Sequence, residues 1–347
     1  MAHRHLASAR SLTALVAAAW MAAASPLAGQ APTGAAGTAG KAGASYKAPR
    51  TPDGQPDLQG FWTNSTYTPL ERPDGVTKEF YTPEEAVEAE KRAAEREGEQ
   101  TVPGTTADVH YDLTQFGLDR SQSAYARNLR TSLVVDPPDG RVPPLTAEGQ
   151  KRAADRAAAR KAAGGQFNAV ENMPVGSRCI IMAGAGPPLM NAGYNANYHI
   201  VQAPNHVMIL TEMIHDVRIV PIDGRPAPPP GLRQWIGLSR GRWECDTLVV
   251  ETTNFNGKNP FRGASENIRV TERFTRIADD RIEYRFTIDD PATWARPWSA
   301  EIAMQKTIGP IFEFSCHETN YGIANVLAGA RADEKRAAES AARKGSE

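Results

Sequence analysis

The feature that most constrains the fold is a long stretch of alternating apolar and polar residues between Arg178 and Glu318. Alternation with a period of two is typical of β-strands that bury one face and expose the other. The links are short, such as Ala203-Pro204-Asn205 and Asp279-Asp280, and short links join antiparallel neighbours. The predicted strands are 198–202, 207–213, 216–220, 234–239, 242–244, 247–253, 268–276, 281–289, 299–307 and 311–316.

A series of sequential strands must hide its two edges, because an open edge presents unpaired backbone donors and acceptors. We therefore expect a mainly β fold, an antiparallel up-and-down barrel of the calycin or lipocalin type with peripheral helices, over residues 178–320. A two-sheet β-sandwich is the alternative. The chain of 347 residues with 41% hydrophobic content is large enough to bury such a core.

One hairpin reveals its own register. Strand 281–289 places Ile282, Tyr284, Phe286 and Ile288 on one face, and strand 268–276 places its apolar residues on even positions as well. Matching the two apolar faces requires an odd number of linking residues. The sequence therefore predicts a three-residue connection with a bulge, and not a two-residue turn.

The N-terminus has the layout of an export signal. Residues 1–31 combine a basic start at Arg4 and Arg10 with an apolar segment from Leu12 to Ala24 and small residues near Ala28. The apolar segment is too short to favour spanning a bilayer. Residues 32–45 are rich in Gly, Ala, Ser and Thr and predict a flexible linker. We expect a periplasmic or secreted protein with no integral membrane segment in the mature chain.

Residues 46–177 are expected to wrap around the barrel and to carry two surface helices. A short strand is expected to start at Gly60-Phe61-Trp62. Thr82-Pro83-Glu84-Glu85 supplies a capping Thr, an initial Pro and a Glu at the third position for a helix that runs to about Glu95. Thr146 is expected to cap a second helix, Ala147 to Ala163, which ends at Gly164-Gly165.

Two further helices are expected outside the barrel. Arg120 to Leu129 can hold a short helix that contains Tyr125. Residues 321–347 predict a C-terminal helix and tail, in which Ile323, Val326 and Leu327 have the spacing of a packed face.

The chain contains three cysteines, and an exported protein is expected to pair two of them. Cys179 precedes the β-rich region and Cys316 ends it, so a disulfide between them would close the region. Cys245 lies at a tight turn and is expected to be the free thiol. The cysteine spacings fit no zinc motif.

The net charge of −1 gives no electrostatic reason to expect nucleic acid or an anionic membrane as a partner. Gly184-Ala185-Gly186-Pro187-Pro188 lacks the Lys and the helix of a phosphate-binding loop. A small-molecule ligand is the expected partner, and the sequence does not indicate an oligomeric state.

Six short motifs stand out along the mature chain. They are Thr-Pro-Asp-Gly-Gln-Pro-Asp-Leu at 51–58, Pro-Leu-Glu-Arg-Pro at 69–73, Glu-Met-Ile-His at 212–215, Asp-Gly-Arg-Pro at 223–226, Arg-Gly-Arg-Trp-Glu at 240–244 and Cys-His-Glu at 316–318. Together they resemble the motifs of an uncharacterised family of exported bacterial proteins. The resemblance covers most of the mature chain and implies export, but it brings no activity.

The candidate catalytic residues lie at two places. His215, with Glu212 and Asp216 nearby, has the composition of a general acid–base site, since a His oriented by a carboxylate transfers protons near neutral pH. On a regular strand Glu212 and His215 point to opposite faces, so they can share a site only across a bulge or through other neighbours. The alternative is a structural His–Asp pair.

His317 and Glu318 form the second place, directly after Cys316. A disulfide at Cys316 would hold His317 rigidly, and His215 and His317 could then face one cavity with Glu212 or Glu318 as partner. The alternative is that His317 and Glu318 cap the following helix.

Candidate ligand-binding residues are Tyr198, His199, Arg218, Trp235 and Trp243, at strand ends and loops. The aromatic side chains could line a pocket for an apolar or sugar-like ligand, or they could fill the core. Arg218 could hold a carboxylate or phosphate, or form an internal ion pair.

No cofactor is predicted. Zinc or iron held by His and Glu is possible in principle, although no local His-x-His or His-Glu-x-x-His pattern supports it. The leading hypothesis is an exported β-barrel enzyme, a lyase, isomerase or hydrolase acting on a small, partly apolar organic molecule by His and carboxylate chemistry. A non-catalytic carrier and a metal-dependent enzyme are the alternatives.

Overall fold

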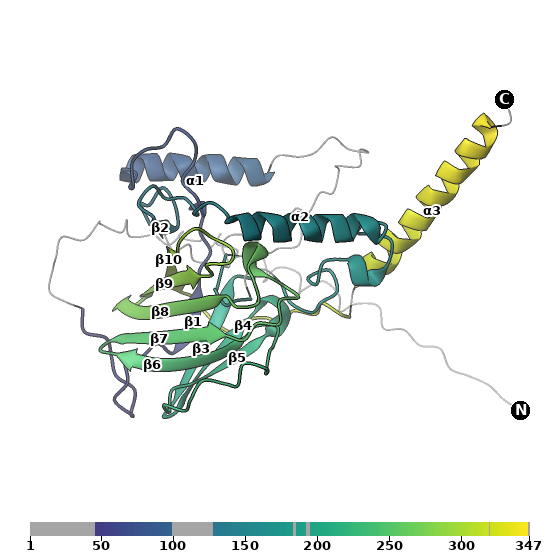
Figure 1. The fold of residues 1–347 in the computed structure, drawn as a ribbon. Coiled ribbons are helices and arrows are strands. Elements are labelled where there is room, and N and C mark those ends of the chain that lie inside the picture. The colour runs from purple at the N-terminus through teal and green to yellow at the C-terminus, as the bar shows by residue number, and fades with distance from the viewer. Residues whose placement is uncertain (1–45, 99–127, 183–184, 192–194, 319, 346–347) are drawn as a thin grey trace, which may run out of the picture. The chain divides into compact units, whose positions relative to one another are not determined.

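The computed structural model describes residues 46–98, 128–182, 185–191, 195–318 and 320–345. The signal peptide, the linker and the helix expected at 120–129 lie outside these residues, apart from the last two residues of that helix. The described chain is mainly β, with an antiparallel sheet that is nearly closed into a barrel and three α-helices (Figure 1). The strands are β1 (Gly60–Thr63), β2 (Val134–Asp136), β3 (Asn197–Ala203), β4 (His206–Thr211), β5 (Val217–Pro221), β6 (Leu238–Glu244), β7 (Thr247–Thr253), β8 (Arg269–Ala278), β9 (Arg281–Asp289) and β10 (Trp298–Lys306).

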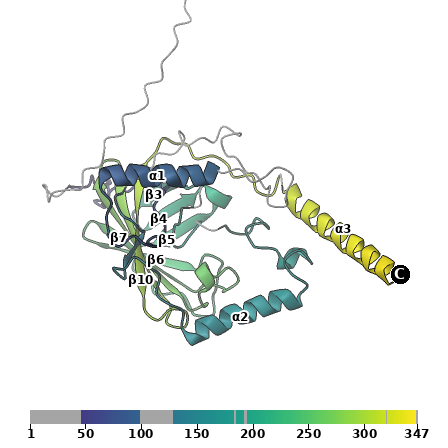
Figure 2. The same cartoon turned by 90° about the horizontal axis from the view of Figure 1, so that it is seen from above.

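The strands follow an up-and-down order around the barrel. The hydrogen-bonded order is β5-β4-β3-β1-β10-β9-β8-β7-β6, and β2 pairs with β10 beside β1. The two end strands, β5 and β6, also contact each other, so the sheet nearly closes (Figure 2). The expected antiparallel barrel is confirmed. Because β1 stands between β3 and β10, the N-terminal wrapping segment supplies one strand of the ring.

Gly241 allows β6 to approach β5 closely. A Cβ atom at Gly241 would lie 2.7 Å from Ile222 Cγ2 and 2.8 Å from Val220 Cγ1. The sequence prediction was wrong to split this region into strands 234–239 and 242–244. β6 is one continuous strand, since the glycine makes room for the facing side chains without interrupting the ladder with β7.

The hairpin of β8 and β9 has the predicted register and a bulge. Phe274 pairs with Tyr284 and Val270 with Ile288, so the apolar faces match. The register shifts between Arg276 and Ala278, which supplies the odd residue inside the strand. The predicted loop length was wrong, because the bulge leaves only Asp279-Asp280 between the strands.

The predicted strand at 311–316 is wrong. Residues 307–316 form no strand, because β10 is already paired with β9 on one side and with β1 and β2 on the other. The chain leaves β10 across Phe61, where Thr307 N donates to Phe61 O at 2.9 Å. Gly309 lies so close to the Phe61 ring that a Cβ atom would be 2.2 Å from it.

The barrel interior is filled by large side chains that are fully buried. Trp62, Trp298, Tyr284, Phe286 and Phe274 meet there, with ring centroids 4.8 to 5.9 Å apart in the pairs Phe274–Tyr284, Tyr284–Phe286 and Phe286–Trp298. Alternate residues of each strand supply this interior. A smaller core lies outside it and is called the stapled cluster here. Its buried members are Cys179, Ile181, Ala185 and Ile214, and Val175, Ile180, Met182, Trp235, Ile236, Phe314 and Cys316 pack against them.

The helices begin at the predicted capping residues. In α1 (Pro83–Gly98), Thr82 N donates to Glu85 Oε2 at 2.8 Å and Glu85 N donates to Thr82 Oγ1 at 3.3 Å, a reciprocal capping box. In α2 (Ala147–Ala162), Gly149 N donates to Thr146 Oγ1 at 3.0 Å. Gly164 and Gly165, both with positive φ, end this helix as expected.

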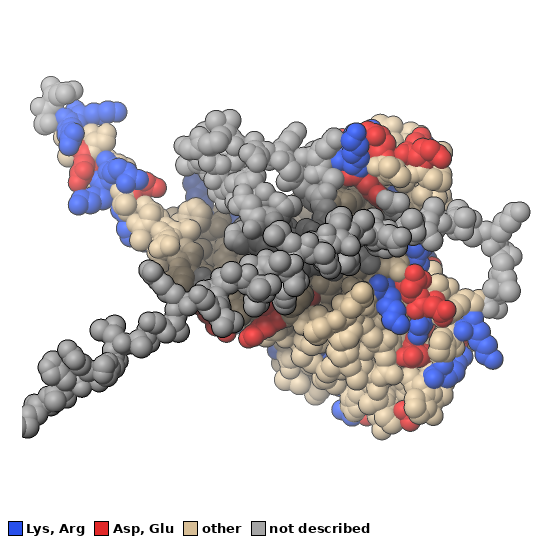
Figure 3. Space-filling model, turned by 180° about the vertical axis from the view of Figure 1, so that it is seen from behind, with Lys and Arg blue, Asp and Glu red and all other residues tan. Residues whose placement is uncertain are grey.

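The C-terminal helix α3 (Tyr321–Lys344) forms, but it does not pack as predicted. None of its residues is buried, and Val326 is exposed. Lys and Arg alternate with Asp and Glu along its C-terminal half (Figure 3). Arg331 donates to the carbonyl oxygens of Phe167 and Asn168, which follow α2. No helix among the described residues has the length and apolar character needed to cross a bilayer.

Candidate functional site

The turn between β4 and β5 carries the first group of candidate residues. Its short 3-10 helix η4 (Met213–His215) holds Ile214 and His215 in the left-handed region, with φ of 63° and 51°. Thr211 N donates to Asp216 O at 2.9 Å and closes the turn. Sequence reasoning had extended strand 207–213 into this turn. The left-handed pair lets Ile214 point into the stapled cluster while His215 remains exposed.

Glu212 is buried and is used within the fold. Its two carboxylate oxygens accept hydrogen bonds from the side-chain amides of Asn195 and Asn197, the second at 3.0 Å. Glu212 N also donates to Asn197 O at 2.9 Å, which joins the turn to the start of β3. The carboxylate is therefore directed toward β3, whereas His215 is on the exposed side of the turn.

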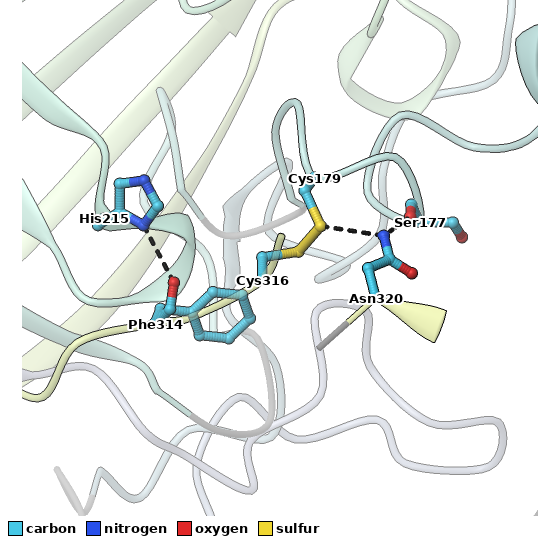
Figure 4. The surroundings of a disulfide bond; sticks show 6 residues. All are labelled: Ser177, Cys179, His215, Phe314, Cys316 and Asn320. Atoms are coloured by element: carbon cyan, nitrogen blue, oxygen red, sulfur yellow. Dashed lines mark hydrogen bonds between the residues drawn. A yellow bond between two sulfur atoms is a disulfide. The ribbon is translucent and has the colours of Figure 1, made fainter. Parts of the chain in front are cut away.

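His215 is held by a backbone carbonyl. Its Nδ1 lies 3.1 Å from Phe314 O, and a carbonyl oxygen can only accept, so Nδ1 carries the proton (Figure 4). In the neutral ring Nε2 is then the basic nitrogen. Burial raises the pKa of the neighbouring Asp216, and the charge of His215 opposes that shift.

The disulfide between Cys179 and Cys316 is present, as predicted, and Cys245 is an exposed free thiol. Asn320 supports the disulfide by donating from Nδ2 to Ser177 O at 2.8 Å and to Cys179 Sγ at 3.2 Å (Figure 4). His317 and Glu318 follow it and are exposed. The disulfide segment meets the His215 turn through Phe314, and no described contact joins His215 to His317.

Two of the candidate ligand residues point into the barrel. Arg218 is buried and paired with Glu272, whose carboxylate also accepts from Tyr284 OH at 2.8 Å. Burial alone would lower the pKa of Arg218, but the charge of Glu272 raises it overall. Tyr198 is buried beside this group, and burial raises its pKa. Arg218 is thus held in an internal ion pair, and Tyr198 OH donates to Met190 O at 3.4 Å.

The other three ligand candidates lie on different parts of the fold. His199 of β3 faces outward, stacked on Phe61 with ring centroids 4.2 Å apart. Trp235 precedes β6, whereas Trp243 is the last residue but one of that strand. Of the predicted ligand residues, Trp235 is the one that lines the pocket described next.

A pocket of about 330 Å³ lies at the end of the barrel where β7 ends and β8 begins. Its lining is mostly apolar, and most of it comes from two segments that sequence reasoning did not select as a site, the 185–191 segment and the 254–268 loop. The lining residues are Leu70, Ile181, Met182, Gly186, Pro187, Pro188, Met190, Asn191, Trp235, Phe255, Gly257, Asn259, Pro260, Phe261, Arg262, Ser265 and Ile268.

The 254–268 loop is held in place by hydrogen bonds from several elements. Arg233 donates to Phe255 O at 3.0 Å and to Glu266 O at 2.7 Å. Arg156 of α2 donates to Gly263 O at 3.1 Å. Ser265 donates from N and from Oγ to the buried carboxylate of Asp290, at 2.6 and 2.9 Å. This wall of the pocket is therefore preformed.

The opposite wall is tied to the barrel interior. Leu189 N donates to Tyr284 OH at 2.8 Å, so the 185–191 segment is connected through Tyr284 to the Arg218–Glu272 pair. Asn64 Nδ2 donates to Leu189 O at 3.2 Å, and Asn191 Nδ2 donates to Thr66 O at 2.7 Å. Ile181 and Met182 continue this wall into the stapled cluster.

The fold and the pocket define an up-and-down β-barrel with a mainly apolar pocket at one end. Comparisons with models of protein families, with curated proteins and with solved structures find no match. Within the described residues, no three His, Cys, Asp or Glu side chains gather closely enough to hold a metal ion.

Proposed function

We propose that the barrel binds a small, partly apolar organic molecule in the pocket between the 185–191 segment and the 254–268 loop. The observation that carries this proposal is the pocket itself. Its volume of about 330 Å³ and its mostly apolar lining with a few polar groups match the usual form of a small-molecule site. Walls that are fixed before binding lower the entropic cost of ordering them around a ligand.

The test is a thermal-shift screen of aromatic and aliphatic compounds with the full chain, in which a ligand that binds the folded chain raises the Tm by an amount that grows with the ratio of its concentration to its Kd. Met182→Trp places a larger side chain at the pocket wall and is expected to weaken binding roughly tenfold or more. Met208→Trp, on the outward face of β4, is the matched control and should bind like the wild type. Equal binding by both variants would place the ligand elsewhere.

A second candidate function is acid–base catalysis by His215, which does not line this pocket, on a small molecule that reaches the exposed side of the turn between β4 and β5. The specific support is the Nδ1–Phe314 contact, which fixes the ring and leaves Nε2 as the base. His215→Gln is expected to lower kcat about 100-fold for an enolisable ketone or activated ester that the wild type converts. His206→Gln is the control. Unchanged turnover in His215→Gln would end this proposal.

We also propose that the chain is exported. The Cys179–Cys316 disulfide supports this, since structural disulfides persist in oxidising compartments. Fractionation of producing cells, with thiol labelling of each fraction, tests it: the disulfide-bonded form should be found outside the cytoplasm. Recovery of a reduced chain in the cytoplasmic fraction alone would contradict export.

A further inference from the structure

Arg262 stands in the pocket lining in an unusual backbone conformation. It lies in the short 3-10 helix η5 (Phe261–Gly263) with φ of 47°, a region that residues with a side chain seldom adopt. Such strain is commonly found where a side chain must be aimed at a ligand. Here the left-handed residue adds an arginine, with 45% of its side chain exposed, to the lining of an otherwise mainly apolar pocket.

Within the described part of the chain, donors of the Arg262 guanidinium have no hydrogen-bond partner. Among the described residues it forms an ion pair with Glu71, at 3.6 Å between Nη2 and Oε2, and makes no hydrogen bond. Glu71 itself accepts from Val142 N at 2.9 Å. By contrast, the neighbouring Arg233 and Arg156 give their hydrogen bonds to loop carbonyl oxygens. Arg262 therefore has donors that can bind a ligand, whereas Arg233 and Arg156 use their donors to hold the 254–268 loop.

The charges around the pocket favour an anion. No Asp or Glu of the described residues lines it, and Lys258, although not a lining residue, has its Nζ 5.9 Å from the centre of the ring of Trp235, which does line it. Of the acidic groups nearby, Asp290 is buried and bonded to Ser265, and Glu266 lies 3.7 Å from Arg233. Glu71 is the one that would compete with a ligand for Arg262.

We propose that the pocket selects small organic anions, with an aromatic or apolar body against Trp235 and Phe261 and the anionic group beside Arg262. An Arg guanidinium binds a carboxylate or sulfonate through charge-assisted hydrogen bonds, which are stronger in a partly apolar setting than in water. The inference rests on the proposed function, because it names the class of ligand that the same pocket takes.

The experiment compares two fluorescent probes that share an anilinonaphthalene body. 1-Anilinonaphthalene-8-sulfonate is anionic and N-phenyl-1-naphthylamine is neutral. Titration into the full chain is expected to show at least about tenfold tighter binding of the anion, a typical gain from a hydrogen bond to a charged group. Arg262→Gln should remove this preference and leave the affinity for the neutral probe within about twofold.

Two variants serve as controls. Arg262→Lys keeps the charge but not the paired donors, so it should retain an intermediate preference. Arg242→Gln changes an exposed arginine of β6 that pairs with Glu244, and it should behave as the wild type. Should Arg262→Gln be unfolded, the wild-type comparison of the two probes and the Lys variant still decide the question.

The outcomes separate the two proposals. Equal affinity for both probes, or a preference that persists in Arg262→Gln, would overturn the selection of anions and leave the binding pocket in place. Failure of both probes to bind, together with no hit in the thermal-shift screen, would overturn the pocket and the selection together.

Discussion

The barrel interior and the stapled cluster are both buried, but they are held by different forces. The interior is a continuous core of fully buried aromatic and aliphatic side chains from nine strands. The stapled cluster has four buried members, and its segments come from loops joined by a disulfide and a few hydrogen bonds. The free energy gained by burying apolar surface is proportional to the area buried, so a larger core stabilises the fold more. The barrel should therefore be stable by itself, while the pocket wall built on the cluster depends on a small number of specific links.

The largest expected effect comes from the charges inside the barrel. Arg218→Met would leave Glu272, which is fully buried, without its charge partner, and the free energy of unfolding should fall by about 3–5 kcal/mol. Urea denaturation at neutral pH measures it. Arg269→Met, which breaks the exposed pair with Glu251, should cost less than about 1 kcal/mol. A loss at Arg218 no greater than the loss at Arg269 would mean that Glu272 is not charged in the folded barrel.

The disulfide should matter next, and mainly for the cluster. The double change Cys179→Ser and Cys316→Ser opens a link between residues 137 positions apart, and should cost about 2–4 kcal/mol. Hydrogen exchange should become faster in the 185–191 segment, while β8 and β9 remain protected. Cys245→Ser is the control and should change neither. Equal loss of protection in the strands would show that the cluster and the barrel unfold as one unit.

Tyr284 holds Leu189 of the 185–191 segment to the barrel interior, and the first residue of that segment, Ala185, belongs to the stapled cluster, so replacement of Tyr284 tests whether the two regions are coupled. Tyr284→Phe removes the acceptor of Leu189 N and the donor to Glu272, at an expected cost of about 1–3 kcal/mol. The Leu189 amide should exchange faster, and ligand affinity at the pocket should fall. Tyr46→Phe removes an exposed hydrogen bond to Asp279 and should stay within about 0.5 kcal/mol. An unchanged Leu189 amide in Tyr284→Phe would show that the bonds of Asn64 and Asn191 hold that wall without Tyr284.

The difference between the barrel and the loop segments around it also explains what could be predicted from the sequence. The barrel strands, the bulge of β8 and the two helix caps depend on periodicity and on residues close in sequence, and these were predicted. The Cys179–Cys316 pair was predicted because the expectation of export called for one disulfide, and two of the three cysteines lie at the ends of the β region. Strand 311–316 failed because its apolar pattern could not show that both edges of β10 were already occupied.

The candidate site was less predictable. The 212–216 turn was predicted to be an acid–base site because it contains Glu, His and Asp. The sequence could not show that Glu212 is hydrogen-bonded to Asn195 and Asn197. The pocket is formed by segments about 70 residues apart, and Arg262 was not among the residues selected from the sequence. One signal was available: Pro260-Phe261-Arg262-Gly263 places an aromatic and a cation in a turn between two strands. Whether the donors of an arginine are used can be read only from the folded neighbours.

The smallest expected effect is the pH response of the turn that carries Ile214 into the stapled cluster. Burial raises the pKa of Asp216 above 3.8, so the folded chain binds this proton more tightly than the unfolded chain. The resulting stabilisation is full below pH 3.8 and is lost as pH rises through the folded pKa. Asp216→Asn cannot ionise, so it should be more stable than the wild type at pH 7, with a flatter pH profile above pH 4. Urea denaturation across pH 3–7 measures both.

Asp223, just beyond β5, is the matched control because its shift has the opposite sign. Hydrogen bonds from Arg225 lower the pKa of Asp223 to about 2, so its contribution is present above pH 3.8 and is lost as pH falls toward 2. Asp223→Asn should therefore remain less stable than the wild type, or equal to it, at pH 7. If the two Asn variants shift stability in the same direction, burial at Asp216 is not the cause, and the turn is more open to solvent than its contacts with the cluster indicate.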